Sequence, residues 1–533
     1  MLGKVPVNAD RPNLTEADGS STASSIWMPD HNLAAIAESN PRLWLTNELL
    51  FNYQRCNRRA YLDVFGDWEQ SDPPSDYLLK LKQDSYNHQR LVLSESPVEQ
   101  ATYPPRDWIA GATATLELMQ NGAERIARAV LLLPQGNGIV LVSCPDLLIK
   151  EPGASYFGNW RYVPTEIKLG KRPKLDYQIT AAFHAYVLAA VQGTWSETSF
   201  LVLRQRGIYA IDLVELLPKM QTILDDCMQM FSVPQAPDVF IAHNRCDLCH
   251  WFSHCYGIAT RDRHLSLLPG VTPSRYVHLQ DLQLTTVESL ATVHPHQLES
   301  LPGFGTQVAH RLIRQAQSTL QQQALVKPFE PDIAPNPLLT DIEIPTAPIE
   351  LYFDIEAAPE QNLVYLHGVL VVDRLHQTET FHPLLADRPE DEGVIWQKFI
   401  DLVWHYPTAP IFHFCPYEVQ TVKRLADYYD TPYDQIEPLL TRFVDLHERI
   451  TRVAILPVES YALKPIARWL GFNWRDQGAN GAQSIYWYSE WLSTGNRAFL
   501  DAILCYNEDD CRATYRVKDW LVGFVQTAQL GHE

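Results

Sequence analysis

The sequence predicts an α/β protein with more than one domain. Its 533 residues exceed what a single hydrophobic core usually organises. Strand-like and helix-like stretches alternate over residues 41–261, and again from 349 to the end. Between them lie a helical region, 262–325, and a segment, 326–348, whose six prolines exclude a long helix and predict a semi-rigid linker. The polar residues up to about 40 predict a loose tail.

Composition narrows the function classes. Hydrophobic residues make up 46% and charged residues 20%, as in ordinary globular proteins. A formal charge of −20 argues against a protein that coats polyanions, but it leaves room for a nuclease with local basic contacts. Nine cysteines with one tight cluster do not fit a secreted disulfide framework, and no run of about 18 apolar residues occurs. We therefore expect a cytoplasmic protein with no membrane partner.

The elements of the first α/β region follow from periodicity and turns. Thr46 is expected to cap a helix in which Leu49, Leu50, Tyr53 and Cys56 recur at helical spacing. A second helical stretch follows around SYNHQRLVL. RIARAVLLL and IVLVSCPDLLIK predict strands joined by a PQGNG turn. WRYVPTEIKLG adds a strand, DYQITAAFHAYVLAAVQG a helix, and SFLVLRQRGIYAIDL a strand pair.

Two of these strands carry the first group of candidate catalytic residues. Asp146 follows one strand, while Glu166 and Lys168 stand at i and i+2 on another, so the latter two face the same side. Asp146 and Glu166 on neighbouring strands could share a Mg²⁺ or Mn²⁺ ion, since these ions prefer oxygen ligands. Lys168 would then orient or deprotonate the attacking water. The alternative is a solvated strand face with a cross-strand ion pair.

Two further residues complete this group. His88 on the upstream helix could supply a nitrogen ligand, and Gln178 on the following helix could hold the metal or its water. The order Asp, Glu-x-Lys and a helix with Gln resembles the PD-(D/E)XK nuclease core in its RecB-like branch. The resemblance implies a restriction-endonuclease-like fold, and His88 matches the upstream histidine of that branch. One departure is the helix tyrosine, which follows Gln178 only at Tyr186, eight residues later instead of four.

NRCDLCHWFSHC places three cysteines, Cys246, Cys249 and Cys255, as C-x2-C-x5-C. In iron–sulfur members of the RecB-like branch a lone cysteine precedes the nuclease core, and Cys56 matches it. The resemblance thus implies a [4Fe–4S] cluster with four thiolate ligands, and structural zinc is the alternative. Such a centre would close a loop of about 190 residues around the first site. The remaining cysteines are expected to be buried and inert, and the neighbouring histidines to be local polar residues: Cys144, Cys227, Cys415, Cys505, Cys511, His243, His250 and His254.

Residues 262–325 contain two similar pieces, LSLLPGVTPSRYVHL and LESLPGFGTQVAHRL. Each has apolar residues, a Pro-Gly turn and a helix start, which can present backbone N–H groups to a phosphate. The pieces resemble helix-hairpin-helix motifs, and that resemblance implies sequence-independent DNA contact through Arg311 and Arg314. An ordinary helical connector is the alternative.

The final region carries a second group of candidate residues. In IELYFDIEAAP, Asp354 and Glu356 stand at i and i+2, so both face one side of a strand. Their mutual repulsion is costly unless a cation lies between them. In the late helix, Tyr506 and Asp510 are four residues apart and share a face, whereas Asp509 points elsewhere.

This pattern resembles the DEDD exonucleases of the RNase H-like fold, in the branch with Tyr-x3-Asp. The resemblance implies that Glu418 takes a position where many members have Asp, and Asp445 is the reserve candidate. Four carboxylates can hold two metal ions about 4 Å apart, here Mg²⁺ or Mn²⁺. Tyr506 would position the water. The alternative is a folded RNase H-like domain with surface carboxylates and no activity.

Together the modules resemble a family of RecB-like nucleases with a fused RNase H-like exonuclease domain. That resemblance implies a metal-dependent nuclease acting on DNA single strands or ends, in repair, recombination or processing. Two alternatives are a catalytically silent nucleic-acid-binding adaptor and an RNA-directed 3′ exonuclease. No G-x4-G-K-[ST] phosphate loop occurs, so any unwinding would need a separate helicase.

Overall fold

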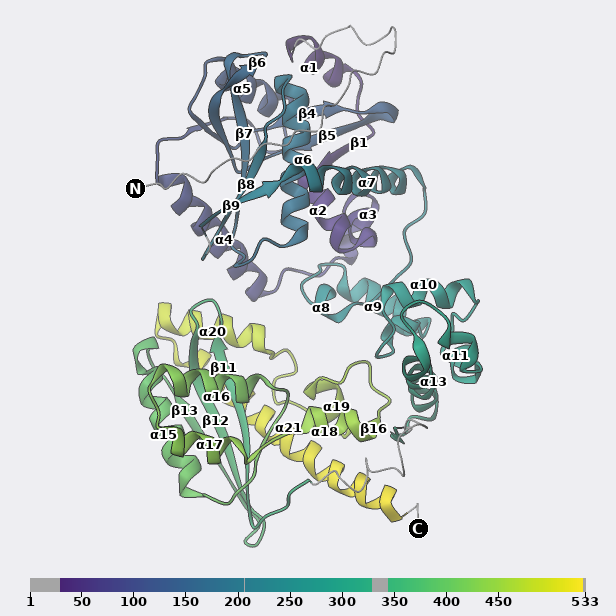
Figure 1. Ribbon diagram of the computed structural model, residues 1–533, viewed down its shortest axis with the longest axis vertical. Coiled ribbons are helices and arrows are strands. Elements are labelled where there is room, and N and C mark those ends of the chain that lie inside the picture. The colour runs from purple at the N-terminus through teal and green to yellow at the C-terminus, as the bar shows by residue number, and fades with distance from the viewer. Residues whose placement is uncertain (1–28, 206, 328–343, 531–533) are drawn as a thin grey trace, which may run out of the picture. The chain divides into compact units, whose positions relative to one another are not determined.

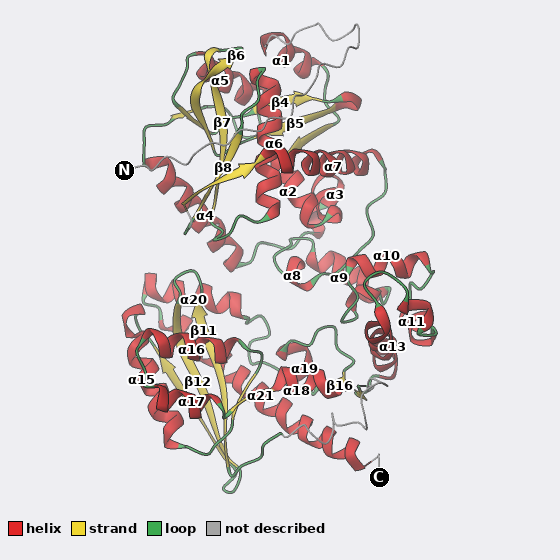
Figure 2. Cartoon of the chain, in the orientation of Figure 1, coloured by secondary structure: helices red, strands yellow, loops and turns green. Residues whose placement is uncertain are grey.

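The protein is described by a computed structural model that covers residues 29–205, 207–327 and 344–530 (Figure 1). The α/β fold class predicted from the sequence is confirmed, with strands and helices in both halves of the chain (Figure 2). In the described part of the chain, every helix is too short or too polar to cross a membrane. The predicted linker at 326–348 lies largely outside the described residues.

The chain divides into two compact units. One contains the chain up to Arg55 together with Asn87–Val233, and the other contains Cys56–Tyr86 together with Pro234–Glu533. The predicted boundary at residue 261 differs from this division. All four cysteines of the predicted cluster belong to the second unit, not to the unit that holds Asp146 and Glu166.

Two sheets organise the first unit. The larger has the order β2-β3-β6-β7-β8-β9, and the smaller has the order β1-β5-β4. The strands of the larger sheet are Glu99–Gln100 (β2), Arg125–Ala127 (β3), Leu147–Ser155 (β6), Gly158–Lys168 (β7), Thr198–Leu203 (β8) and Gly207–Asp212 (β9). Those of the smaller sheet are Leu43–Thr46 (β1), Leu131–Pro134 (β4) and Ile139–Ser143 (β5).

Helix α6 lies at the centre of this unit. It contacts β7 and β8 of the larger sheet as well as β4 and β5 of the smaller one, so both its faces are apolar and buried. Helix α6 spans Leu175–Gln192. The other helices of this unit are Pro29–Glu38 (α1), Asn47–Arg55 (α2), Trp108–Gln120 (α5) and Leu213–Ser232 (α7). Helix α4, Asp76–Ser94, begins in the second unit and ends in the first.

The structure differs from the sequence-based expectation at three places. Residues 29–38 form helix α1 instead of a loose tail, because Ile36 packs into a small apolar core with α5 and β4. Cys56 does not continue helix α2; it has extended backbone and caps the next helix, Asn57–Phe65 (α3). The stretch 139–150 is two strands in different sheets, with Asp146 at the break between β5 and β6.

The second unit begins with α3 and a set of short helices around an apolar core. Leu265, Leu279, Leu290 and Leu312 are among its fully buried members. The helices are His243–Cys246 (α8), Phe252–Arg261 (α9), Pro273–Asp281 (α10), Val287–Thr292 (α11), His296–Glu299 (α12) and Gly305–Gln321 (α13). A two-stranded pairing of Leu325–Val326 (β10) with Ala454–Ile455 (β16) follows.

A five-stranded sheet forms the rest of this unit, in the order β13-β12-β11-β14-β15. Its first three strands are antiparallel, and β14 and β15 run parallel to β11. The strands are Ile349–Ala358 (β11), Leu363–Asp373 (β12), Thr378–Leu385 (β13), Ile411–His413 (β14) and Phe443–Asp445 (β15).

Helices cover both faces of this sheet (Figure 2). One face packs on Glu392–His405 (α15), Tyr417–Tyr428 (α16) and Tyr433–Leu440 (α17). The other packs on Leu446–Val453 (α18), Leu463–Trp469 (α19), Gly481–Thr494 (α20) and the long helix Arg497–Leu530 (α21). A hydrophobic core therefore lies on each side of the sheet, as expected for a three-layer α/β domain.

Candidate active site

Successive side chains of strand β11 point to opposite faces of the sheet. Leu351, Phe353 and Ile355 enter the core on the α15 side, so Asp354 and Glu356 must face the other way, toward helix α21. Helix α21 in turn presents Asp510 to the strand. The strand and the helix thus bring together acidic side chains that are far apart in the sequence.

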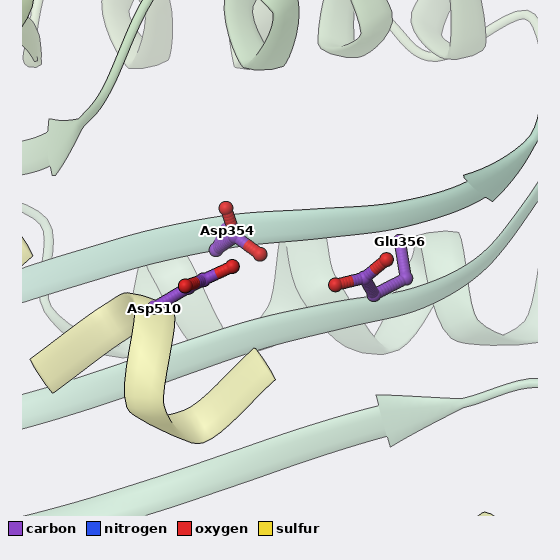
Figure 3. A group of neighbouring side chains, drawn as sticks. All are labelled: Asp354, Glu356 and Asp510. Atoms are coloured by element: carbon purple, nitrogen blue, oxygen red, sulfur yellow. The ribbon is translucent and has the colours of Figure 1, made fainter. Parts of the chain in front are cut away.

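Three carboxylates meet there. Oxygen atoms of Asp354, Glu356 and Asp510 all lie within 4.8 Å of one another. Figure 3 shows their carboxyl groups turned toward each other, between the strand and the helix. Glu356 and Asp510 are only 5% and 7% exposed, so water screens their repulsion poorly. Among the described residues, this is the one such group of potential metal ligands.

The electrostatic cost of this arrangement appears in the pKa values. Burial, followed by the charge of Asp510, raises the pKa of Asp354 and the pKa of Glu356 well above their ordinary values. Burial also raises the pKa of Asp510, to about 6, although hydrogen bonds from Trp474 and Tyr506 oppose the rise. Without a cation, the protein must either protonate these groups or bear their repulsion.

Neighbouring polar groups hold the carboxylates in place. Asn507 Nδ2 donates to Asp354 Oδ2 at 2.7 Å, and the indole Nε1 of Trp474 donates to Asp510 Oδ1 at 2.7 Å. Ser484 hydrogen-bonds to Glu356, and Tyr506 to Asp510. Such partners orient carboxylates that ligate metals.

Gly368, opposite Asp354 on β12, makes room for Asn507. A Cβ atom at Gly368 would lie 1.6 Å from Asn507 Oδ1, so only glycine allows this amide to reach Asp354.

Lys464 brings a positive charge to the edge of the cluster. Its Nζ donates to the Ala479 carbonyl and lies 5.4 Å and 4.9 Å from the ring centroids of Trp474 and Tyr506. Its charge acts on Asp510 and Glu356, and burial lowers the pKa of Lys464. One ammonium cannot balance three carboxylates, so the donor set fits a divalent cation.

The other predicted acids occupy different places. Glu418 lies on α16, where its charge reaches Asp354, but it stands outside the group within 4.8 Å. His413 Nδ1 is 3.4 Å from Glu418 Oε2, and burial raises the pKa of Glu418. Asp445 caps helix α18 by accepting from the backbone of His447 at 2.9 Å, a structural role.

Asp509 points away from the carboxylate group, as predicted. It accepts from the backbone and the guanidinium of Arg475, both at 2.8 Å.

These features define the class of the C-terminal part. The five-stranded sheet with its antiparallel and parallel halves, and the acidic residues on β11 and α21, are those of an RNase H-like domain. Residues 351–522 match a family model described as the RNase_H superfamily. No curated protein matches the chain. The match indicates a hydrolase of the nuclease type and supports no finer activity.

The first predicted group also comes together, within the first unit. Asp146 Oδ2 accepts a 2.6 Å hydrogen bond from the backbone N–H of Ile167, the residue that separates Glu166 from Lys168 in the sequence. Glu166 pairs with Lys168 and, through its other oxygen, with His184. Burial and the charge of Glu166 raise the pKa of Asp146 to about 7. Burial would also raise the pKa of Glu166, but Lys168 and His184 together hold it below its ordinary value.

Protein partners already occupy the carboxylates of this first group. Gln89 Nε2 donates to Asp146 Oδ1 at 2.6 Å, and Lys168 Nζ is engaged with Glu166. A metal ion here would have to displace at least one of these contacts, in contrast to the site on β11 and α21.

Two of the helper residues considered for the first group, Gln178 and Tyr186, contact other residues instead. Gln178 donates to the Pro173 carbonyl at 2.7 Å, a local contact at the start of α6. Tyr186 lies against Trp195. His88 is half-buried on α4, and its Nε2 is a buried ring nitrogen without a hydrogen-bond partner. Burial and the charge of Arg204 lower the pKa of His88.

Sequence reasoning missed the two residues that do contact the carboxylates. His184 lies on α6 with its Nδ1 2.7 Å from Ser143 Oγ, and its exposed fraction is 0%. Gln89 stands one residue after the predicted His88. His184 could not be singled out from the sequence because it lies among buried apolar residues of α6. Its position six residues after Gln178 also matches no residue of the RecB-like pattern.

The four cysteines of the predicted cluster are also brought together, in the second unit. Each of Cys246, Cys249 and Cys255 interacts electrostatically with Cys56 and with at least one other member. Helix α3 is bonded to the segment that carries the later cysteines. Its Asp63 Oδ1 accepts from His250 Nε2 and from Trp251 Nε1, both at 2.8 Å. Of the predicted inert thiols, Cys227 and Cys511 are buried, and Cys144, Cys415 and Cys505 are partly buried.

The two Pro-Gly turns of the helical region are joined by a residue that the sequence did not single out. Arg275 donates to the Gly270 carbonyl at 2.7 Å and to the Gly303 carbonyl at 2.9 Å. Arg311 is exposed beside the first turn, whereas Arg314 is half-buried and donates to Gln317. Of the two predicted phosphate contacts, Arg311 is thus the accessible one.

Proposed function

We propose that the protein is a metal-dependent nuclease that hydrolyses phosphodiesters of DNA, at single strands or ends, through its RNase H-like site. The observation that carries the proposal is the cluster of Asp354, Glu356 and Asp510, whose oxygens lie within 4.8 Å. A buried trio of carboxylates is costly in an isolated fold and becomes favourable when a cation is bound. The match of residues 351–522 to the RNase_H superfamily supports the same class of activity.

The proposed chemistry follows from the residues present. Asp354, Glu356 and Asp510 would hold Mg²⁺ or Mn²⁺, which when bound polarises the phosphate and lowers the pKa of a water molecule. Tyr506, hydrogen-bonded to Asp510, keeps its proton because burial and the three carboxylates raise its pKa. That proton is donated to Asp510, so the phenol oxygen is left as an acceptor that can orient a water toward phosphorus. Glu418 lies at the edge of the site, where its charge acts on Asp354.

The first group is proposed as a second cleavage site. The convergence of Asp146, Glu166 and Lys168, with the partnerless Nε2 of His88 on the preceding helix, supports this assignment. The matching family model begins at residue 351, so the RecB-like character of the first group stays a prediction. The same holds for DNA repair, recombination or processing as the setting, and for a helicase as partner.

The four cysteines are proposed to hold a [4Fe–4S] cluster. Four thiolates are the ligand count of a [4Fe–4S] cluster, and they suit structural zinc equally. The order of one cysteine before and three after the first group supports the cluster, through the resemblance to iron–sulfur members of the RecB-like branch.

A nuclease assay tests the main proposal. Purified protein is incubated with end-labelled single-stranded and duplex DNA, and with RNA of the same sequence, in Mg²⁺, Mn²⁺ or EDTA. We expect metal-dependent cleavage that Asp354→Asn and Lys168→Met each reduce, and that the exposed control Asp401→Asn leaves unchanged. Cleavage insensitive to both active-site changes would belong to a contaminant. Tight binding without cleavage would support an adaptor, and preference for the RNA would reassign the substrate.

A further inference from the structure

Several cations around helix α21 are neutralised by acidic side chains. Four of them form ion pairs within the RNase H-like domain: Arg374 with Asp519, Lys518 with Glu350, Arg475 with Asp509, and Arg512 with Glu508. Lys464 on α19 differs from these four. Among the described residues, no carboxylate forms an ion pair with Lys464, and its Nζ donates to a neutral acceptor, the carbonyl of Ala479.

The ammonium of Lys464 lies beside the cluster of carboxylates. Its Nζ is 5.4 Å from the ring centroid of Trp474 and 4.9 Å from that of Tyr506. Trp474 donates to Asp510, and Tyr506 lies one helical turn before Asp510 on α21. The faces of the two rings therefore hold the cation on the Asp510 side of the cluster.

This ammonium has hydrogen-bonding capacity that the protein does not use. A lysine ammonium carries three N–H donors and no acceptor. The carbonyl of Ala479 accepts from one donor, and in the part of the chain that the structure describes no second oxygen or nitrogen acceptor contacts Lys464. Because Lys464 is only partly buried, an incoming anion can accept from the other donors.

The charge of the site favours a phosphate as that anion. Three ionised carboxylates and one divalent cation together keep one negative charge, which repels a phosphodiester. The whole chain carries a formal charge of −20, so attraction of a nucleic-acid strand must come from local cations. Lys464 supplies a positive charge next to Asp510.

We propose that Lys464 binds the substrate, by donating to a non-bridging oxygen of the phosphodiester that is held at the carboxylate cluster. This inference rests on the proposed nuclease activity of the RNase H-like site. The contact positions the phosphorus atom and offsets charge on the phosphate oxygens, and no bond to Lys464 forms or breaks. The hydrogen bond to Ala479 holds the ammonium in place before the substrate binds, which reduces the ordering that binding requires.

The test compares two substitutions of this lysine in the full-length protein. Lys464→Gln keeps a donor for the Ala479 carbonyl but has no charge, whereas Lys464→Arg keeps the charge. Lys398→Gln is the matched control, because Lys398 is exposed on α15, which packs on the opposite face of the sheet.

Two measurements are made on each protein. The first is kcat/KM for cleavage of an end-labelled single-stranded DNA oligonucleotide in Mg²⁺, at several salt concentrations. Only the share of cleavage that Asp354→Asn removes is compared, so that the first group does not contribute. The second is the Mn²⁺ affinity without DNA, by isothermal titration calorimetry.

For Lys464→Gln, we expect kcat/KM to fall by about tenfold or more. Its dependence on salt should also become less steep, because each lost contact to a single strand removes about 0.7 from the slope. Lys464→Arg should recover part of the loss, and Lys398→Gln should match wild type. The Mn²⁺ affinity of Lys464→Gln should not fall, because the substitution removes a charge that repels the metal.

A purely structural lysine would give a different result. Values of kcat/KM within about twofold of wild type in Lys464→Gln, or an unchanged salt dependence, would overturn the inference. Weaker Mn²⁺ binding by this variant would also overturn it, because Lys464 would then act on the metal site through the fold. If Lys464→Gln does not fold, Lys464→Met, which keeps an apolar stem, replaces it under the same criteria.

Failure of the nuclease proposal can be told apart from failure of this inference. Wild-type protein without metal-dependent cleavage, or with cleavage that Asp354→Asn leaves unchanged, would overturn both. Cleavage that Asp354→Asn abolishes and Lys464→Gln leaves unchanged would overturn the role of Lys464 alone.

Discussion

The indole Nε1 of Trp474 donates a 2.7 Å hydrogen bond to Oδ1 of Asp510, the carboxylate that helix α21 contributes to the acidic cluster. Trp474 is 3% exposed, and Lys464 Nζ lies 5.4 Å from its ring centroid. The hydrogen bond fixes the plane of the carboxyl group that Asp510 presents to Asp354 and Glu356. Trp474 is therefore a positioning residue for Asp510.

Replacing Trp474 by Phe should weaken divalent metal binding at this site. The ring volume is largely kept, but Asp510 loses a donor that stabilises its ionised form, so its pKa should rise and protons should compete better with the metal. We expect Mn²⁺ affinity at pH 7 to fall by about 10- to 100-fold, as is typical for outer-shell partners. Isothermal titration calorimetry measures this directly.

Trp487→Phe provides the comparison for that experiment. Trp487 belongs to the same apolar core and is 9% exposed. Its substitution should cost a similar amount of packing without changing Mn²⁺ affinity. Equal losses in the two variants would mean that Trp474 acts through packing alone.

Asp354→Asn should stabilise the metal-free protein at pH 7 and abolish its stabilisation by Mg²⁺. The cluster carboxyls have raised pKa values in the folded state, so the folded protein binds more protons than the unfolded chain between the two sets of values. For Asp510 this window runs from about 4 in the unfolded chain to about 6 in the folded protein. The metal-free wild type should therefore lose stability as pH rises through that window.

Removal of one charge relieves the repulsion. We expect the free energy of unfolding of metal-free Asp354→Asn to exceed that of wild type by roughly 1–3 kcal/mol at pH 7, and the difference to vanish below pH 4. Urea denaturation at several pH values, with and without Mg²⁺, provides the measurement. A variant less stable than wild type at every pH would show that Asp354 is a structural anchor, with Asn507 as its essential partner.

The parts of this site that could be predicted are pairs of residues close together on one strand or one helix. Asp354 and Glu356 are two apart on a strand, and Tyr506 and Asp510 are four apart on a helix, so their shared faces follow from backbone geometry alone. Trp474 gave no such sign, because it follows α19 in a loop and reaches Asp510 across 36 positions.

The first group shows the same limit more sharply. Asp146, Glu166 and Lys168 could be predicted because the strand pairing β6–β7 brings them together. The polar partner from α6 could not be predicted correctly, because that helix is buried on both faces between two sheets. Its apolar residues show no stripe, so periodicity did not indicate that His184, instead of Gln178, faces Glu166.

A glycine on β12 offers a test of how Asn507 reaches the cluster. Gly368→Ala would bring a Cβ to 1.6 Å from Asn507 Oδ1, so the amide must move and its 2.7 Å bond to Asp354 must break. We expect a loss of about 1–3 kcal/mol in the free energy of unfolding, together with weaker Mn²⁺ binding. Gly523→Ala on α21, where a Cβ meets no atom within 4 Å, should not weaken either property. Unchanged Mn²⁺ affinity in Gly368→Ala would show that Asn507 does not orient Asp354.

His184→Ala and Gln178→Ala separate the observed from the predicted partner of Glu166. The side chain of Glu166 is buried, and His184 and Lys168 pair with its two oxygens, so loss of His184 leaves one side of a buried carboxylate without a donor. We expect His184→Ala to lower the free energy of unfolding by about 3 kcal/mol or more, because a buried carboxylate is left without one of its donors. Gln178→Ala removes only the 2.7 Å bond to Pro173 and should cost about 1 kcal/mol. His184→Gln, which can keep a donor near Glu166, should recover part of the loss. Denaturant unfolding of the three variants measures this order, and a larger loss in Gln178→Ala than in His184→Ala would contradict it.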